Sequence, residues 1–233
     1  MQFIVLVLLG GLIGIHAAEP VRALIIDGRN NHDWRSTTDH LRATLEAAGR
    51  FEVTASTAPQ LRFPNVPRKA KRSEDESALT EARKHFEKPQ AEAKADLAPR
   101  WDKWAPHFAS ADVVVLNYNG EEWPVRIRNA FVEFVRSGGG VVLIHGSNNA
   151  FRNWPEFNEM IGLGWRPALI GKAIKVDPRS GKTYIANEID LSNNGNSGHG
   201  SKHAFQVTVR APDHPMMQGL PPIWMHARDE LYH

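Results

Sequence analysis

Histidines with polar neighbours carry the chemistry that this sequence could perform. His32 and Asp33 follow the residues Gly-Arg-Asn-Asn, and His145 stands at the end of an apolar run. An imidazole can remove or deliver a proton near neutral pH, and a neighbouring carboxylate can orient it. We therefore predict that His32, Asp33 and His145 are catalytic residues in general acid–base chemistry.

Other polar and aromatic side chains near these positions are candidates for binding a polyhydroxylated ligand. Amides and hydroxyls can bond sugar hydroxyls, and an aromatic face packs against sugar C–H groups. The predicted substrate-binding residues are Trp34, Asn117, Tyr118, Asn119, Ser147, Asn148, Asp229 and Glu230. For Asp229 and Glu230, a solvated pair of carboxylates is an equal alternative.

The downstream histidines have the residue types that bind a divalent metal. His199 and His203 are four positions apart, and His226 lies shortly before Asp229 and Glu230. Imidazole and carboxylate ligands suit Zn²⁺ or Mn²⁺, so we predict that His199, His203 and His226 bind such an ion. The glycines around His199 indicate a loop, and the alternative is that the imidazoles only bond its backbone.

Composition and missing motifs exclude several classes of protein. The 233 residues include 28 Lys and Arg against 26 Asp and Glu, without the concentrated basic surface that nucleic acid requires. The absence of cysteine excludes a disulfide framework, a thiolate metal site and a cysteine nucleophile. There is no Gly-x-Ser-x-Gly elbow, no phosphate-binding P-loop, and no dinucleotide fingerprint after the first strand.

Alternating strands and helices must position these side chains. A buried strand is predicted at 22–28, an alternating strand at 51–55, and strands buried on both faces at 111–117 and 141–145. Shorter strands are predicted at 172–176, 183–186 and 204–209. Helices are predicted at 124–136, at 154–161, and from a cap at Ser36 or Thr37 to residue 48. This order predicts a doubly wound α/β domain with a parallel sheet, in which ligands bind at the carboxyl ends of strands. His32, Asn117 and His145 all follow such ends.

Two segments lie outside this pattern. Residues 64–105 are dense in charge and predict a solvated helical insertion. Residues 3–15 form an apolar run of about 13 residues, too short to cross a bilayer as a helix but typical of a secretion signal. We predict a signal peptide over 1–18, cleaved near Ala18, and a periplasmic or secreted protein with no stable membrane span. The alternative is that residues 1–18 form a buried first strand or helix.

Several motifs together resemble the ThuA-like (trehalose utilisation) domain family. In chain order they are Asn30–Trp34, Val115–Gly120, Gly139–His145, Gly198–Gly200, Asp213–Pro221 and Trp224–Tyr232. The resemblance implies one domain over 19–233 with a flavodoxin-like three-layer sandwich and a mostly parallel sheet, similar to class I glutamine amidotransferases. His145 falls where those enzymes carry their nucleophilic cysteine, so amidotransferase activity is not implied. Family members usually continue beyond Tyr232, which predicts a chain truncated at its carboxyl end.

The resemblance also implies a role in the use of trehalose or a related 3-keto disaccharide, with a functional link to sugar oxidoreductases. A ketone at C3 acidifies the C2 proton, which His145 or His32 can remove, with Asp33 orienting His32 or binding sugar hydroxyls. The enediolate would be stabilised by a metal or by Asn117 and Asn119, and the glycosidic bond would then be eliminated or hydrolysed. Two alternatives remain: a non-catalytic sugar-binding domain that has lost the amidotransferase nucleophile, and a metal-dependent hydrolase of another substrate.

Overall fold

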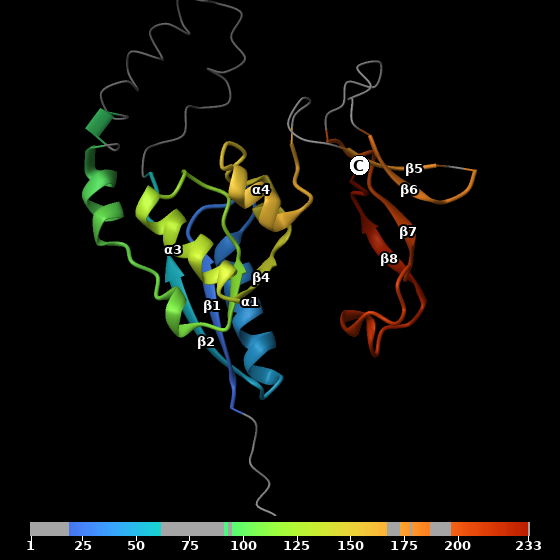
Figure 1. The fold of residues 1–233 in the computed structure, drawn as a ribbon, viewed down its shortest axis with the longest axis horizontal. Helices are drawn as coiled ribbons and strands as arrows, with labels where there is room; N and C mark the ends of the chain where they lie inside the picture. Colours follow the sequence, from blue (N-terminus) through green and yellow to red (C-terminus); the bar gives the residue numbers. More distant parts are fainter. Residues whose placement is uncertain are drawn as a thin grey trace, which may run out of the picture. The chain divides into compact units, whose positions relative to one another are not determined.

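The computed structural model describes residues 19–61, 91–92, 95–166, 173–177, 179–186 and 197–232. The chain divides into two units, Met1–Ile161 and Gly162–His233 (Figure 1). The predicted signal peptide and most of the insertion lie outside the described residues. No helix within the described ranges combines the length and the apolar character that a membrane crossing requires.

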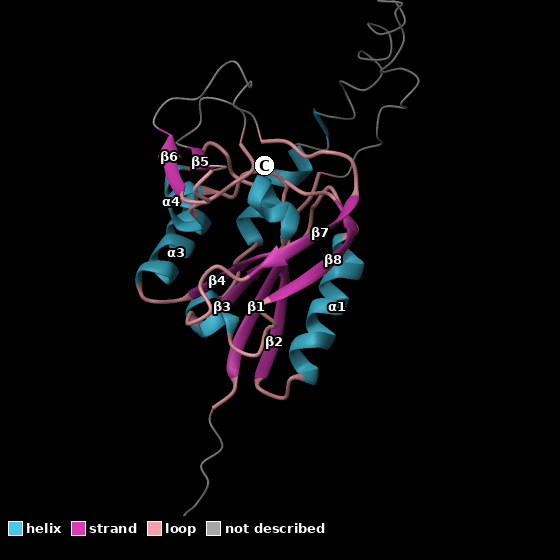
Figure 2. Ribbon diagram, turned by 90° about the vertical axis from the view of Figure 1, so that its right-hand side faces the viewer, coloured by secondary structure: helices cyan, strands magenta, loops and turns pink. Residues whose placement is uncertain are grey.

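A four-stranded parallel sheet organises the first unit, in the order β2-β1-β3-β4 (Figure 2). The strands are β1 (Val21–Asp27), β2 (Phe51–Thr57), β3 (Val113–Leu116) and β4 (Gly140–Leu143). Helix α1 (Trp34–Ala47) lies on one face, and α3 (Val125–Arg136) lies on the other. The short helix α4 (Pro155–Ile161) follows β4. The predicted α/β architecture with a parallel sheet is confirmed.

Buried aromatic rings form the core between the sheet and α3. Leu24 and Ile26 of β1 lie opposite Val114 and Leu116 of β3, and these four residues share one face of the sheet. The rings packed with them are Trp101, Trp104, Phe108, Tyr118, Trp123, Phe131, Phe134, Phe151, Trp154 and Phe157. The core fixes the strands in register and thereby fixes where each strand ends.

The described end of the insertion contributes to this core, which corrects the prediction that 64–105 is solvated throughout. Residues 95–103 are helical, and Leu97, Trp101 and Trp104 are buried. Their spacing places them on one helical face. Arg126 of α3 donates hydrogen bonds to three carbonyls at the end of this helix, those of Trp101, Asp102 and Trp104.

Two further predictions about local structure were wrong. Helix α1 is capped by Asp33, not by Ser36 or Thr37: the Asp33 carboxylate accepts a hydrogen bond from the Ser36 backbone N–H at 3.3 Å. Strand β4 is not buried on both faces, because α1, which covers the face opposite the aromatic core, packs against β1 and β2. Val142, on the face opposite the aromatic core, is 45% exposed.

The second unit consists of two antiparallel strand pairs. One pairs β5 (Ala173–Val176) with β6 (Thr183–Ala186), and the other pairs β7 (His203–Thr208) with β8 (Ile223–Asp229). The strands predicted near β5, β6 and β7 are confirmed. Strand β8 was missed, although half-buried Trp224 and His226 alternate with exposed neighbours along it.

Candidate functional site

The loops that follow β1, β3 and β4 meet at the carboxyl edge of the first unit's sheet, because these three strands are neighbours. This edge brings together two of the predicted catalytic residues. The imidazole rings of His32 and His145 have centroids 4.7 Å apart and planes inclined by 55°. Both residues are exposed, so the pair is accessible to a ligand.

His145 is held in a strained backbone conformation. The chain passes from β4 almost directly into the 3₁₀ turn η3 (His145–Asn149), and His145 has a φ of +32°. A non-glycine residue in such a sparsely populated region costs of order 1–3 kcal/mol and persists only where the surroundings enforce it. The sharp turn presents the imidazole at the edge of the sheet.

Two asparagines that sequence reasoning did not select hold the loop of His32. The His32 backbone N–H donates to Asn30 Oδ1 at 3.2 Å, and Asn31 Nδ2 lies 3.3 Å from His32 Nε2. Asn119 Nδ2 donates to Asn31 Oδ1 at 3.2 Å, which turns the Asn31 amide so that its Nδ2 faces the ring. Nε2 of His32 then accepts this bond, and the neutral imidazole carries its proton on Nδ1. Two signals were available: both asparagines directly precede His32, and both belong to the motif Asn30–Trp34.

Asn117 does not expose a hydrogen-bond donor at the carboxyl edge of the sheet, contrary to the prediction that it binds substrate. It is 2% exposed, and its Nδ2 donates to the Trp34 carbonyl at 2.9 Å and to Thr38 Oγ1 at 3.0 Å. Its Oδ1 accepts a bond from Asn30 Nδ2 at 3.3 Å. The Asn117 side chain, just after β3, therefore links the loop of His32 to α1.

Ser147 and Tyr118 are also buried structural groups and not exposed ligands. The Ser147 hydroxyl is 0% exposed; it donates to the Leu116 carbonyl at 2.7 Å and accepts from the Tyr118 backbone N–H at 2.9 Å. The Tyr118 hydroxyl donates to the Glu121 carbonyl at 2.8 Å, and burial raises the pKa of this phenol. These bonds fasten η3 to the end of β3, which helps to hold His145 in its turn.

The other predicted residues of this edge lie at its rim. Asp33 is exposed and caps α1, whereas Trp34 is half-buried with the Arg35 guanidinium 4.2 Å above its ring centroid. Asn119 and Asn148 are half-buried. An ion pair between Arg29 and Glu121, which the sequence did not suggest, joins the loops after β1 and β3. A ligand that reaches the histidines would therefore meet both amides and charged groups.

A hollow of about 760 Å³ lies at the opposite edge of the sheet, beside Phe108, Phe134 and Gly139. Its acidic lining residues are Asp112 and Glu133. Asp112 is already paired with Arg22, whose hydrogen bonds lower the pKa of Asp112 to about 2. Ligands of parallel sheets bind at the carboxyl ends of the strands. The hollow is at the amino ends of the strands. We therefore assign the candidate site to the carboxyl edge of the sheet, where His32 and His145 lie, and call it the histidine edge.

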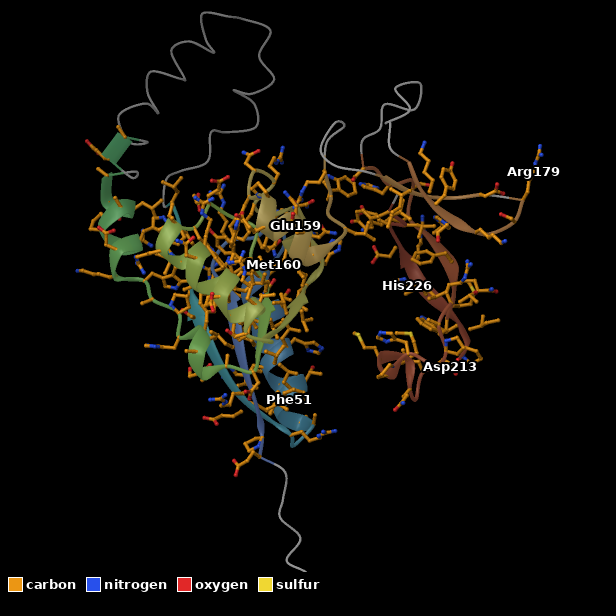
Figure 3. All side chains as sticks on the ribbon, in the orientation of Figure 1. Phe51, Glu159, Met160, Arg179, Asp213 and His226 are labelled. Atoms are coloured by element: carbon orange, nitrogen blue, oxygen red, sulfur yellow. The ribbon has the colours of Figure 1, made fainter. Side chains whose placement is uncertain are left out.

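The histidines of the second unit make local backbone contacts. Nδ1 of His199, His203 and His226 lies 2.9–3.0 Å from a carbonyl oxygen of Gly200, Ser201 and Ala227, respectively. His226 projects from β8 and stacks on Phe205 with ring centroids 4.7 Å apart (Figure 3). In the part of the chain that the structure describes, no three His, Cys, Asp or Glu side chains are grouped to hold a metal ion. The alternative, in which these rings bond the backbone, matches the observed geometry.

Glu230 is the centre of a polar cluster that includes His199 and Lys202. Its carboxylate lies 4.0 Å from His199 Nδ1 and 3.9 Å from Lys202 Nζ. The Tyr232 hydroxyl donates to Glu230 at 2.5 Å, which lowers the pKa of Glu230 and raises the pKa of Tyr232 to about 12. Asp229 lies opposite His203 in the backbone register of β7 and β8, and its carboxylate lies 3.9 Å from Lys202 Nζ. Both predicted carboxylates are therefore engaged within the second unit.

Comparisons with known proteins identify relatives of this chain. A protein family described as trehalose utilisation (ThuA) matches residues 68–233. The crystal structure of a ThuA-like protein from Parabacteroides merdae ATCC 43184 is 32% identical, with a TM-score of 0.66, over 92% of this chain and 63% of that protein. A ThuA-like protein from Bacteroides uniformis ATCC 8492 is 15% identical, with a TM-score of 0.48, over 95% of this chain and 64% of that protein. This chain thus spans less than two thirds of either relative. No curated protein matches it.

Proposed function

Because the chain belongs to the ThuA (trehalose utilisation) family, we propose that it cleaves an oxidised glycoside of the 3-keto-disaccharide type by histidine acid–base chemistry. The observation that carries this proposal is the contact between His32 and His145, whose ring centroids are 4.7 Å apart at the carboxyl edge of the sheet. Two imidazoles in contact can divide the roles of acid and base between them.

The reaction begins with removal of the proton on C2 by His145. The electrons of the C2–H bond move towards the C3 carbonyl and form an enediolate, whose oxygen can be stabilised by a donor such as the Nδ1–H of His32. When the carbonyl re-forms, the bond from C1 to the glycosidic oxygen breaks. The leaving oxygen takes the proton that His145 acquired, so the products are an unsaturated keto sugar and an alcohol. Addition of one water across the new double bond would complete hydrolysis.

The division of labour between the two histidines follows from their different settings. Asn31 occupies Nε2 of His32, so the neutral ring offers a proton donor from Nδ1 and is suited to stabilise an oxyanion. His145 projects from the strained turn, where a general base can be placed against a substrate carbon. Asn119 orients Asn31 and so supports the donor role of His32.

The proposal extends to the origin of the substrate. A 3-keto glycoside arises by two-electron oxidation of the C3 hydroxyl of a glycoside, so a sugar oxidoreductase is the expected supplier. The apolar run before His16 supports the further proposal that this protein is secreted and cleaves its substrate outside the cytoplasm.

The direct test is to incubate the full-length protein with 3-keto-trehalose in D₂O and to follow the C2 proton and the products by NMR. Loss of general-base catalysis costs about 10²- to 10⁴-fold, which is the decrease expected for His145→Ala. His40→Ala, an exposed histidine on α1, is the matched control and should retain full turnover. Full turnover by both His145→Ala and His32→Ala would contradict the assignment. Saturable binding of unmodified trehalose without any conversion would favour the sugar-binding alternative.

A further inference from the structure

Asp27 is a buried carboxylate beneath the histidine edge that the proposed reaction does not use. It ends β1, is 3% exposed, and accepts one hydrogen bond through Oδ2, from Thr38 Oγ1 at 2.9 Å. Its other oxygen, Oδ1, is buried without a hydrogen-bond partner in the described part of the chain. Burying a charged group that is only half satisfied is costly, so a purely stabilising role does not explain why a carboxylate stands here.

The carboxylate determines the direction of a series of hydrogen bonds that ends at His32. A carboxylate oxygen only accepts, so the Thr38 hydroxyl donates to Asp27 and its own oxygen accepts from Asn117 Nδ2. The Asn117 amide then directs its oxygen towards Asn30 Nδ2. Asn30 Oδ1 in turn faces the backbone N–H of His32. The Trp34 carbonyl accepts the second proton of the Asn117 amide and reinforces the same orientation.

We propose that Asp27 is a positioning residue that, through Thr38 and Asn117, orients the loop of His32 and keeps its imidazole beside His145. Hydrogen bonds in such a series polarise one another, and a buried charge at its origin strengthens each bond. The effect on turnover rests on the proposed function, whereas the effect on the His32 ring does not.

Thr38 allows the series to be interrupted with little change in shape. Thr38→Val replaces the hydroxyl by a methyl group, and Thr38→Ser keeps the hydroxyl. Thr44, also on α1, donates its hydroxyl to the His40 carbonyl on the exposed side of the helix. Thr44→Val is therefore a control that removes a similar hydrogen bond at a site unrelated to the series.

The experiment records long-range ¹H–¹⁵N spectra of the histidine rings, which report the ring nitrogen that carries the proton. The native protein, Thr38→Ser and Thr44→Val should show His32 protonated at Nδ1. In Thr38→Val and Asp27→Asn the loop should move His32 Nε2 away from Asn31 Nδ2, which holds the native tautomer, so both tautomers of His32 should be in exchange. Because a misplacement of about 1 Å can cost about 10²-fold in rate, both variants should also lose between about tenfold and 10²-fold in turnover.

Each outcome decides the proposal. Folded Thr38→Val and Asp27→Asn proteins with the native His32 spectrum would overturn it, whatever their turnover. Failure of both variants to fold, with Thr38→Ser native, would assign the series to folding alone and would also overturn it. If the native protein does not convert the keto sugar, the proposed function fails while the ring spectra still test the role of Asp27.

Discussion

Gly146 of η3 lies close to the side chains of Asn30 and Asn31, in a loop that we call the asparagine loop. Replacing Gly146 by alanine tests whether this close approach positions His32. A β-carbon at this position would lie 2.5 Å from Asn30 Oδ1 and 2.9 Å from Asn31 Oδ1, and real β-carbons essentially never make contacts under 3.0 Å. The Asn30 oxygen would therefore have to withdraw by about 0.5 Å, and the amide would have to rotate.

The magnitude follows from the bonds that this rotation breaks. The Asn30 amide accepts from the His32 backbone N–H at 3.2 Å and donates to Asn117 Oδ1 at 3.3 Å. Each bond contributes about 0.5–1.5 kcal/mol, and replacing glycine by alanine returns about 0.4–1 kcal/mol through the unfolded chain. We expect a net loss of about 1–2 kcal/mol in the free energy of unfolding. Because His32 would shift, turnover should fall by about 10²-fold.

Urea unfolding and the NMR signals of the His32 ring measure the two effects separately. Gly140→Ala is the matched control: it lies on β4, and its β-carbon would meet Val113 at an ordinary 3.5 Å. The control should keep the native His32 signals and unfold at the native urea concentration or above it. Native stability and native His32 signals in Gly146→Ala would refute the argument that this close approach positions the loop.

Three further predictions concern parts of the first unit that support the site. Asp112→Asn should lower the melting temperature at neutral pH; because pairing with Arg22 lowers the Asp112 pKa to about 2, the difference from the native protein should shrink as pH falls from about 4 towards 2. Trp123→Ala removes the ring at the centre of the aromatic core and should reduce the free energy of unfolding in urea by about 3–5 kcal/mol. Arg126→Met removes the donor to three carbonyls at the end of the helix over 95–103; the loss should be about 1–3 kcal/mol, with faster amide exchange in that helix.

The sequence was sufficient to predict the edge of the sheet that carries the site. Apolar runs alternating with amphipathic segments predict parallel strands, and the carboxyl ends of neighbouring strands must meet. His32 and His145 lie far apart in the sequence, yet this rule alone was enough to expect them together. Their ring contact of 4.7 Å agrees with it.

Which polar side chains at this edge face the solvent could not be predicted in the same way. Asn117 and Ser147 follow strands just as the histidines do, but both are buried, because their partners come from other loops and from α1. Asn117 bonds residues that are 79–87 positions away, and Ser147 bonds residues 29–31 positions away. Such pairings depend on how the strand ends pack, which periodicity does not report. The cap of α1 was misplaced for a related reason, since Asp33, Ser36 and Thr37 all have side chains that can cap a helix.

The strain at His145 bears on the choice between an enzyme and a sugar-binding domain. Hydrogen-bond donors for sugar hydroxyls can be supplied from unstrained loops, and a binding domain would gain stability by relaxing a φ of +32°. General-base catalysis instead requires one nitrogen at a fixed point near a substrate carbon, which justifies a backbone cost of order 1–3 kcal/mol. The surroundings enforce this conformation: the Ser147 hydroxyl fastens the turn to β3, and Gly146 packs against the asparagine loop. A turn held this firmly, with a second imidazole beside its own, supports the proposed general-base role of His145.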